Sequence, residues 1–373
     1  MTNHHIHTEL VQIGNRSEQV TGAVNPPVYF STAYRHAGIG LSTGYDYSRT
    51  KNPTRALLED SFAKLEEGEQ GFACSSGMAA IQLVLSLFRQ NEEIIASDDL
   101  YGGTYRLLQQ YSESYGIRTH FIDLNDTAKL KAAITEKTKA ILVETPTNPL
   151  MIETDISAIA AVAEKNDLLL IVDNTFLTPY LQKPITLGAD IVLHSATKYI
   201  GGHNDVLAGL VVAKDTAICE KLSAYHNGAG AVLSPFDSWL LIRGLKTLSI
   251  RMERHQENAK KLVEFLQESP EVESVLYPNK GGMVSFRLQK AEWVPAFLKS
   301  LQLITFAESL GGVESFITYP ATQTHADIPE EVRIKRGVCN RLLRFSVGIE
   351  HADDLISDLE QAFAKIRQEE LVL

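Results

Sequence analysis

The sequence predicts an α/β fold, in which a largely parallel, doubly wound sheet is followed by a smaller α+β domain. Uninterrupted apolar runs such as 168–172 and 191–193 are typical of strands that are covered on both faces. From Pro53 onward, stretches with helical periodicity alternate with these short runs, as they do in successive βαβ units. After Pro270 the pattern changes to short strands that flank helices.

The expected elements of the large domain follow in order from these patterns. Residues 1–50 are rich in Gly, Pro, Thr and Tyr and have weak periodicity, so we expect an N-terminal arm before a large domain at 51–245. Helices are predicted at 54–66, 77–89, 103–115, 127–136 and 155–165. Strands are predicted at 93–97, 118–122, 139–144, 168–173, 190–194 and 207–213.

A second, smaller domain is expected at 246–373. A long helical stretch is predicted from about 235 to 268, because an amphipathic run continues to Glu268 and Pro270 then ends it. Strands are predicted at 273–277, 283–288 and 343–347, and helices at 291–299 and 353–367.

Composition excludes several classes of function. The 373 residues carry a net charge of −11, which disfavours nucleic acid or an anionic membrane as a partner. No apolar stretch reaches the length of about 18 residues that a membrane-spanning helix needs. The three cysteines are widely separated and have no metal-binding spacing, so we expect reduced thiols in a cytoplasmic protein and no metal site.

Lys198 is the strongest candidate for catalysis. An apolar run at 191–193 leads into Ser195, Thr197 and this single lysine. Burial lowers the pKa of a lysine, which suits an amine that forms a Schiff base with pyridoxal phosphate. The two hydroxyls are short donors for a phosphate ester. Taken alone, the pattern also fits a surface lysine after an edge strand.

Asp173 strengthens this interpretation. It ends the apolar run 168–172 and lies 25 residues before Lys198, which leaves room for a βαβ unit. Two parallel strands would bring both side chains to the edge of the sheet where ligands bind. Pyridoxal phosphate needs a carboxylate that keeps its ring nitrogen protonated, although Asp173 alone also fits a helix N-cap.

Three further segments could complete a cofactor site. Ser-Ser-Gly77-Met78 precedes a predicted helix, whose N-terminus would favour a phosphate, although the same residues fit an ordinary N-cap. Tyr101 follows a strand and precedes two glycines, so it could stack on the ring or simply pack in a loop. Asn148 follows another strand and could reach the cofactor's phenolic oxygen or a substrate carboxylate.

Seven motifs in this order resemble the Cys/Met-metabolism family of pyridoxal-phosphate enzymes, the transsulfuration group of fold type I. The resemblance covers essentially the whole chain. The motifs are Tyr45–Thr54, Ser75–Met78, Tyr101–Thr104, Glu144–Pro149, Asp173–Phe176, His194–Lys198 and Arg344–Glu350.

The resemblance implies roles for individual residues. Lys198 would be the Schiff-base lysine and proton shuttle, Asp173 would pair with the ring nitrogen, and Tyr101 would stack on the ring. Arg344 would bind the substrate α-carboxylate, with nearby Arg341 as the alternative. Ser309 and Asn148 would assist Arg344 in binding the carboxylate. The residues that would hold the phosphate are Gly77, Met78, Ser195 and Thr197.

The resemblance also implies an oligomer. Tyr47 and Arg49 would reach the phosphate of a neighbouring subunit, so the active site would need at least a dimer, and the family is usually tetrameric. The alternative for this pair is an intrachain salt bridge.

The implied reaction is a γ-replacement that joins an O-acylated homoserine to cysteine, with a second activity toward sulfide, as in bacterial enzymes of methionine biosynthesis. Methionine γ-lyases have a cysteine at the position of Gly103, so this residue argues against methionine γ-lyase activity. Glu308 could receive an amino group of the second substrate or form a salt bridge on a turn, and Arg106 could contact a distal carboxylate. Degradation of cystathionine by a γ- or β-lyase remains the alternative, and a catalytically silent binding protein is a remote one.

Overall fold

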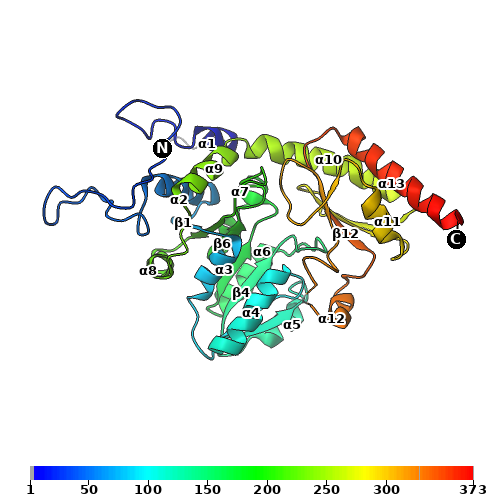
Figure 1. Ribbon diagram of the computed structural model, residues 1–373. Coiled ribbons are helices and arrows are strands. Elements are labelled where there is room, and N and C mark those ends of the chain that lie inside the picture. The colour runs from blue at the N-terminus through cyan, green and yellow to red at the C-terminus, as the bar shows by residue number, and fades with distance from the viewer. Residues whose placement is uncertain (1–3, 327, 373) are drawn as a thin grey trace.

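A mixed sheet of seven strands forms the centre of the larger part of the chain. The computed structural model describes residues 4–326 and 328–372, with side chains through 368. The strand order is β1-β7-β6-β5-β4-β2-β3, and only β7 runs antiparallel to its neighbours. This confirms the predicted α/β fold (Figure 1). The strands are β1 (Gln70–Cys74), β2 (Glu93–Ser97), β3 (Arg118–Ile122), β4 (Thr138–Glu144), β5 (Leu169–Asp173), β6 (Ile191–Ser195) and β7 (Gly209–Ala213).

Helices cover both faces of this sheet because the central strands are apolar on both sides. Ile171 and Leu193 point into a cluster with α3 and α8, whereas Val172 and Val192 point into a second cluster with α6. Alternation along the strand sends neighbouring side chains to opposite faces. The helices are α2 (Pro53–Glu66), α3 (Gly77–Leu85), α4 (Gly102–Tyr115), α5 (Thr127–Ala133), α6 (Ile156–Lys165) and α8 (Thr216–Ala229), with the short α7 (Thr178–Leu181) and η1 (Pro184–Leu187) before β6.

The C-terminal part contains a five-stranded sheet of order β10-β11-β12-β9-β8. Helices α10, α11 and α13 pack together over its strands and enclose a separate apolar core. These strands are β8 (Val272–Leu276), β9 (Met283–Leu288), β10 (Thr305–Phe306), β11 (Phe316–Thr318) and β12 (Leu342–Ser346). The helices are α9 (Pro235–Leu245), α10 (Leu248–Glu268), α11 (Trp293–Ser300), α12 (Glu330–Lys335) and α13 (Ala352–Val372).

The N-terminal segment is mostly irregular. It contains the short helix α1 (Ile6–Gln12) and then no helix before α2. Figure 1 shows the following loops, in blue, extending away from the rest of the chain. Large apolar side chains in these loops are exposed, among them Val24, Phe30 and Ile39.

The structure differs from the predicted elements in several places. Strand β1 and helix α8 were not predicted, and the expected helix at 235–268 is divided into α9 and α10 at residues 246–247. The predicted helices 77–89 and 127–136 end earlier, at Leu85 and Ala133. Among the residues described, no helix combines the length and apolar character needed to cross a membrane.

Candidate active site

The site forms where three parallel strands end. Glu144 is the last residue of β4, Asp173 of β5 and Ser195 of β6. Glu144 and Asp173 are register partners, so their side chains leave the same face of the sheet. Lys198 lies three residues after Ser195, and all four residues line the same cleft. The empty volume of this cleft, including its opening to solvent, is about 1010 Å³.

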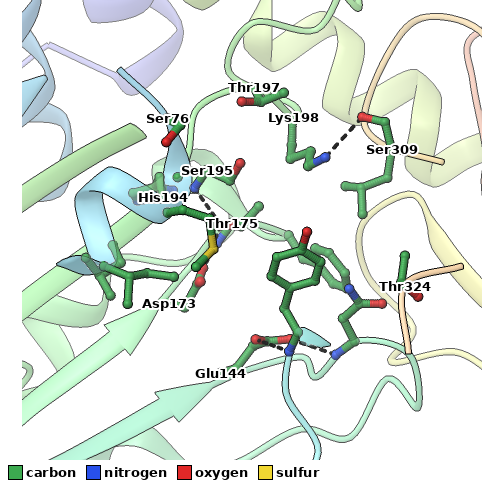
Figure 2. Close-up of a pocket in the computed structure, with 18 of the residues that line it drawn as sticks. Ser76, Glu144, Asp173, Thr175, His194, Ser195, Thr197, Lys198, Ser309 and Thr324 are labelled. Atoms are coloured by element: carbon green, nitrogen blue, oxygen red, sulfur yellow. Dashed lines mark hydrogen bonds between the residues drawn. The ribbon is translucent and has the colours of Figure 1, made fainter. Parts of the chain in front are cut away.

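Lys198 lies across the cleft from the strand ends. Its Nζ donates a hydrogen bond of 3.0 Å to the Ser309 Oγ (Figure 2). Burial lowers the pKa of Lys198 to about 8, and the positive charge of Arg344 acts in the same direction. An amine with this pKa changes protonation state readily near neutral pH, so it can both accept and release a proton.

Asp173 is partly buried where β5 ends at the cleft. Its Oδ1 accepts hydrogen bonds from the Thr175 backbone N–H at 3.0 Å and from the Thr175 hydroxyl at 2.5 Å. Burial raises the pKa of Asp173. A buried carboxyl of this kind is stabilised in its ionised form by a cationic N–H group placed against it.

The N-terminus of α3 lies at one corner of the cleft. Ser76 caps the helix, because its hydroxyl accepts a hydrogen bond of 3.1 Å from the Ala79 N–H. Gly77 lies so close to β6 that a Cβ there would come within 2.8 Å of the Ser195 Oγ. The first N–H groups of the helix and the Ser195 hydroxyl therefore line the same corner, where the helix dipole favours negative charge.

Arg344 on β12 is buried, with 1% of its surface exposed. Its Nη1 donates to the Asn148 Oδ1, and its Nη2 donates to the Ser309 carbonyl and the Thr318 hydroxyl, each at 2.9 Å. Its Nε is buried without a partner among the described residues. Burial lowers the pKa of Arg344 to about 10, so a carboxylate ligand would relieve an uncompensated charge.

These groups fit pyridoxal phosphate. The cleft combines an amine with a lowered pKa, a buried acid for a ring nitrogen and a helix N-terminus for a phosphate. Tyr101 also lines the cleft, and the residue is 38% exposed. Such a ring can stack on a planar cofactor.

Most of the predicted site residues meet in this cleft, although their individual roles stay predictions. The predicted residues that line it are Gly77, Met78, Tyr101, Asn148, Asp173, Ser195, Thr197, Lys198, Glu308, Ser309 and Arg344. The Thr197 hydroxyl already donates to the Ala208 carbonyl, at 3.2 Å.

Three predicted residues do not line the cleft of their own chain. Tyr47 is half exposed on the N-terminal arm, and Arg49 beside it binds the Asn227 side chain at 2.7 Å. The intrachain contact of Arg49 is thus a hydrogen bond rather than the salt bridge considered from the sequence. Arg106 lies on the exposed side of α4.

Sequence reasoning assigned no role to several residues that line the cleft. Glu144 could have been found in the same way as Asp173, because it is also an acidic residue at the carboxyl end of a predicted parallel strand. Thr175 could have been found as the partner of Asp173 two residues away. Leu207 begins the strand predicted at 207–213 but lies before β7, which starts at Gly209, and Thr324 lies in an irregular segment that carries no periodic signal.

Comparison with known proteins identifies close relatives. Residues 7–364 match the family described as Cys/Met metabolism PLP-dependent enzyme. The chain is 64% identical to the cystathionine gamma-synthase/O-acetylhomoserine (thiol)-lyase of Bacillus subtilis over 98% of both chains. It is 61% identical to the cystathionine gamma-synthase of Haemophilus influenzae over 97% of this chain and 98% of the relative. Cystathionine lyases match at lower identity, 43% to 48%.

A solved structure has the same fold. The cystathionine gamma synthase of Xanthomonas oryzae pv. oryzae, in complex with aminoacrylate and cysteine, superposes with a TM-score of 0.96 at 40% identity. The match covers 98% of this chain and all of the other.

Proposed function

The chain belongs to the Cys/Met-metabolism family of pyridoxal-phosphate-dependent enzymes, and on that premise we propose that it is a cystathionine γ-synthase. It joins an O-acyl-L-homoserine to L-cysteine, and it also uses sulfide to form homocysteine, in methionine biosynthesis. The observation that carries this function is the 64% identity, over nearly the whole length, to an enzyme named for both activities.

The reaction replaces one group on the substrate Cγ by another. A proton leaves Cα, a second leaves Cβ, and the carboxylate leaving group departs from Cγ. The thiol then gives up its proton and its sulfur bonds to Cγ, while protons return to Cβ and Cα, so that one proton is released with the carboxylate. Bound pyridoxal phosphate supplies an electron-accepting ring that stabilises negative charge at Cα. The chain's own residues must move these protons and hold the substrate.

Lys198 is suited to move the protons. With a pKa of about 8, its amine can take a proton at Nζ and return it within one turnover. The hydrogen bond to Ser309 keeps Nζ inside the cleft. Asp173 would hold a ring N–H, and the corner at Gly77 and Ser195 would hold the phosphate.

Arg344 would orient the substrate. Arg344 and the adjacent Asn148 line the cleft, and the Arg344 Nε has no partner among the described residues, so this pair suits an α-carboxylate. A fixed carboxylate would restrict rotation and align the Cα–H bond for proton removal. Glu308 also lines the cleft, where it could attract the amino group of the incoming cysteine.

Oligomerisation belongs to the same proposal. The N-terminal arm at 1–50 carries exposed apolar side chains such as Phe30, which a second subunit would cover. Tyr47 and Arg49 lie outside their own cleft, so they would serve the site of the neighbour in a homotetramer built from dimers.

The three described cysteines form no disulfide, which supports a cytoplasmic location.

Steady-state kinetics with the purified holoenzyme test this function. O-Acetyl-, O-succinyl- and O-phosphohomoserine are each supplied with cysteine or sulfide, and cystathionine is supplied alone. We expect the highest kcat/KM for an acylhomoserine with cysteine. Preferred consumption of cystathionine with release of 2-oxobutyrate would instead establish a γ-lyase, and release of pyruvate a β-lyase. Protein that stays colourless after cofactor addition would indicate a silent binding protein.

A further inference from the structure

Glu144 is a buried carboxyl at the back of the cleft that the proposed reaction does not use. It ends β4 and accepts two backbone hydrogen bonds from different loops. Its Oε2 accepts from the Tyr101 N–H at 3.0 Å, and its Oε1 accepts from the Asn148 N–H at 2.8 Å. Figure 2 shows both bonds converging on this one side chain.

These bonds begin a chain of contacts that crosses the whole site. Asn148 Oδ1 accepts from Arg344, Arg344 donates to the Ser309 carbonyl, and the Ser309 hydroxyl accepts from Lys198. The distances are 2.9, 2.9 and 3.0 Å. Glu144 connects the Tyr101 N–H to this chain of contacts, and Asp99 of the same loop adds a separate bond, from the Leu150 N–H at 3.3 Å.

We propose that Glu144 is a positioning residue that holds the Tyr101 loop at a fixed separation from the Asn148–Arg344 pair. It thereby couples the ring that stacks on the cofactor to the group that binds the substrate carboxylate. Both hydrogen bonds of the Glu144 carboxylate are to backbone N–H groups, so we infer that it acts through Tyr101 and Asn148. This role rests on the proposed function, because that function gives Tyr101 and Arg344 their ligands.

A carboxyl group is needed at this position because the two N–H groups approach different oxygens. Glutamine has the same shape but offers one acceptor, and its NH₂ group would face the other N–H. Alanine removes both acceptors and leaves two buried donors unsatisfied, which costs stability as well. Glu144→Gln therefore tests the positioning role with the smaller loss of stability, whereas Glu144→Ala removes both hydrogen bonds.

Asp358 on α13 provides a matched control. It is also buried, and it accepts backbone hydrogen bonds from Gln302, Leu303 and Ile304 at 2.8 to 2.9 Å. It lies in the C-terminal part and does not line the cleft. Asp358→Asn thus removes comparable backbone hydrogen bonding without touching the chain of contacts in the site.

The first experiment measures amide hydrogen exchange in the apoprotein, which needs neither cofactor nor activity. Glu144→Gln should speed exchange in the segments at 100–104 and 146–150 by about tenfold, the effect expected from losing one backbone hydrogen bond to this group. Asp358→Asn should leave these segments unchanged and speed exchange near 302–304 instead.

The second experiment measures cofactor affinity and kinetics in the same proteins. Glu144→Gln should raise both the Kd for pyridoxal phosphate and the KM for acylhomoserine by about tenfold, with a smaller change in kcat. Asp358→Asn should change neither. If Glu144→Gln exchanges like wild type at 100–104 and 146–150, or if both variants shift KM equally, the positioning role is wrong.

Failure of this role is distinguishable from failure of the proposed function. Wild-type protein that never converts acylhomoserine would refute the function, whereas the exchange result in the apoprotein would stand. An active wild type, with a Glu144→Gln variant that keeps wild-type exchange at 100–104 and 146–150 and matches Asp358→Asn in cofactor affinity and KM, would refute only the role of Glu144.

Discussion

Lys198 and Ser309 lie 111 positions apart in the chain, yet the Lys198 Nζ donates a hydrogen bond of 3.0 Å to the Ser309 Oγ. Lys198 follows β6 of the seven-stranded sheet, and Ser309 lies between β10 and β11 of the five-stranded sheet. The position of the amine therefore depends on how the two sheets are held together, and not on the loop after β6 alone.

The lowered pKa of Lys198 predicts how the apoprotein reacts with acetic anhydride. Only the neutral amine reacts, and with a pKa of about 8 its fraction rises steeply between pH 7 and 9 and then levels off. An ordinary lysine, with a pKa of about 10.4, would keep gaining reactivity beyond pH 10. Mass spectrometry of the peptide that contains Lys198 measures the rate.

Lys299 in the same digest serves as the internal reference for reagent decay. A rate at Lys198 that still rises about sevenfold between pH 9 and pH 10, as for an ordinary lysine, would contradict the lowered pKa, and with it the capacity of this amine to exchange protons near neutrality.

Arg344→Lys should raise the KM for acylhomoserine by about tenfold or more, because lysine keeps the charge but loses the planar fork. The absorption spectrum of the bound cofactor should change little. Arg341→Lys is the matched control, since Arg341 is paired with Glu273 at 2.8 Å on the surface and does not line the cleft. If Arg341→Lys raised the KM more than Arg344→Lys does, Arg341 rather than Arg344 would bind the substrate carboxylate.

Gly103→Ala should displace the Tyr101 ring. A Cβ at Gly103 would lie 2.5 Å from the Tyr101 Cε1, which is closer than atoms can pack, and at a tight 3.2 Å from the Met78 Sδ. We expect a shifted cofactor absorption band and a Kd for pyridoxal phosphate raised about tenfold. Gly228→Ala is the control, because a Cβ there meets no atom within 4 Å. Identical spectra for both variants would show that Tyr101 tolerates the added methyl group.

Hybrid oligomers test whether Arg49 serves a neighbouring site. Arg49→Ala and Lys198→Ala homo-oligomers should each be severely impaired. A hybrid of the two has one site with both residues intact if Arg49 acts between subunits, so activity should return to at most half of the wild-type level. Verified hybrids without any recovery would place the action of Arg49 within its own chain.

The strand ends were predictable because parallel strands deliver their carboxyl ends to one edge. Asp173 and the Lys198 segment could be found in this way from apolar runs alone. The contacts of Arg344 could not, since Asn148 lies 196 positions away and the bond depends on packing between two sheets. No periodic pattern contains that information.

Some elements were missed for local reasons. Strand β1 contains Gly71 and has little strand signal, and it is stabilised by antiparallel pairing with β7, which is distant in sequence. Helix α8 buries only three side chains, so its apolar face is too sparse to predict. Residues 246–247 contain neither Gly nor Pro, so no turn residue marks the division between α9 and α10.

Borohydride reduction of the holoenzyme tests the central claim most directly, because it fixes the cofactor covalently to the lysine that holds it. After digestion, the account predicts the pyridoxyl mass on a single peptide, at Lys198 between Thr197 and Tyr199. Stoichiometric label on any other lysine would contradict the assignment of this cleft as the catalytic site.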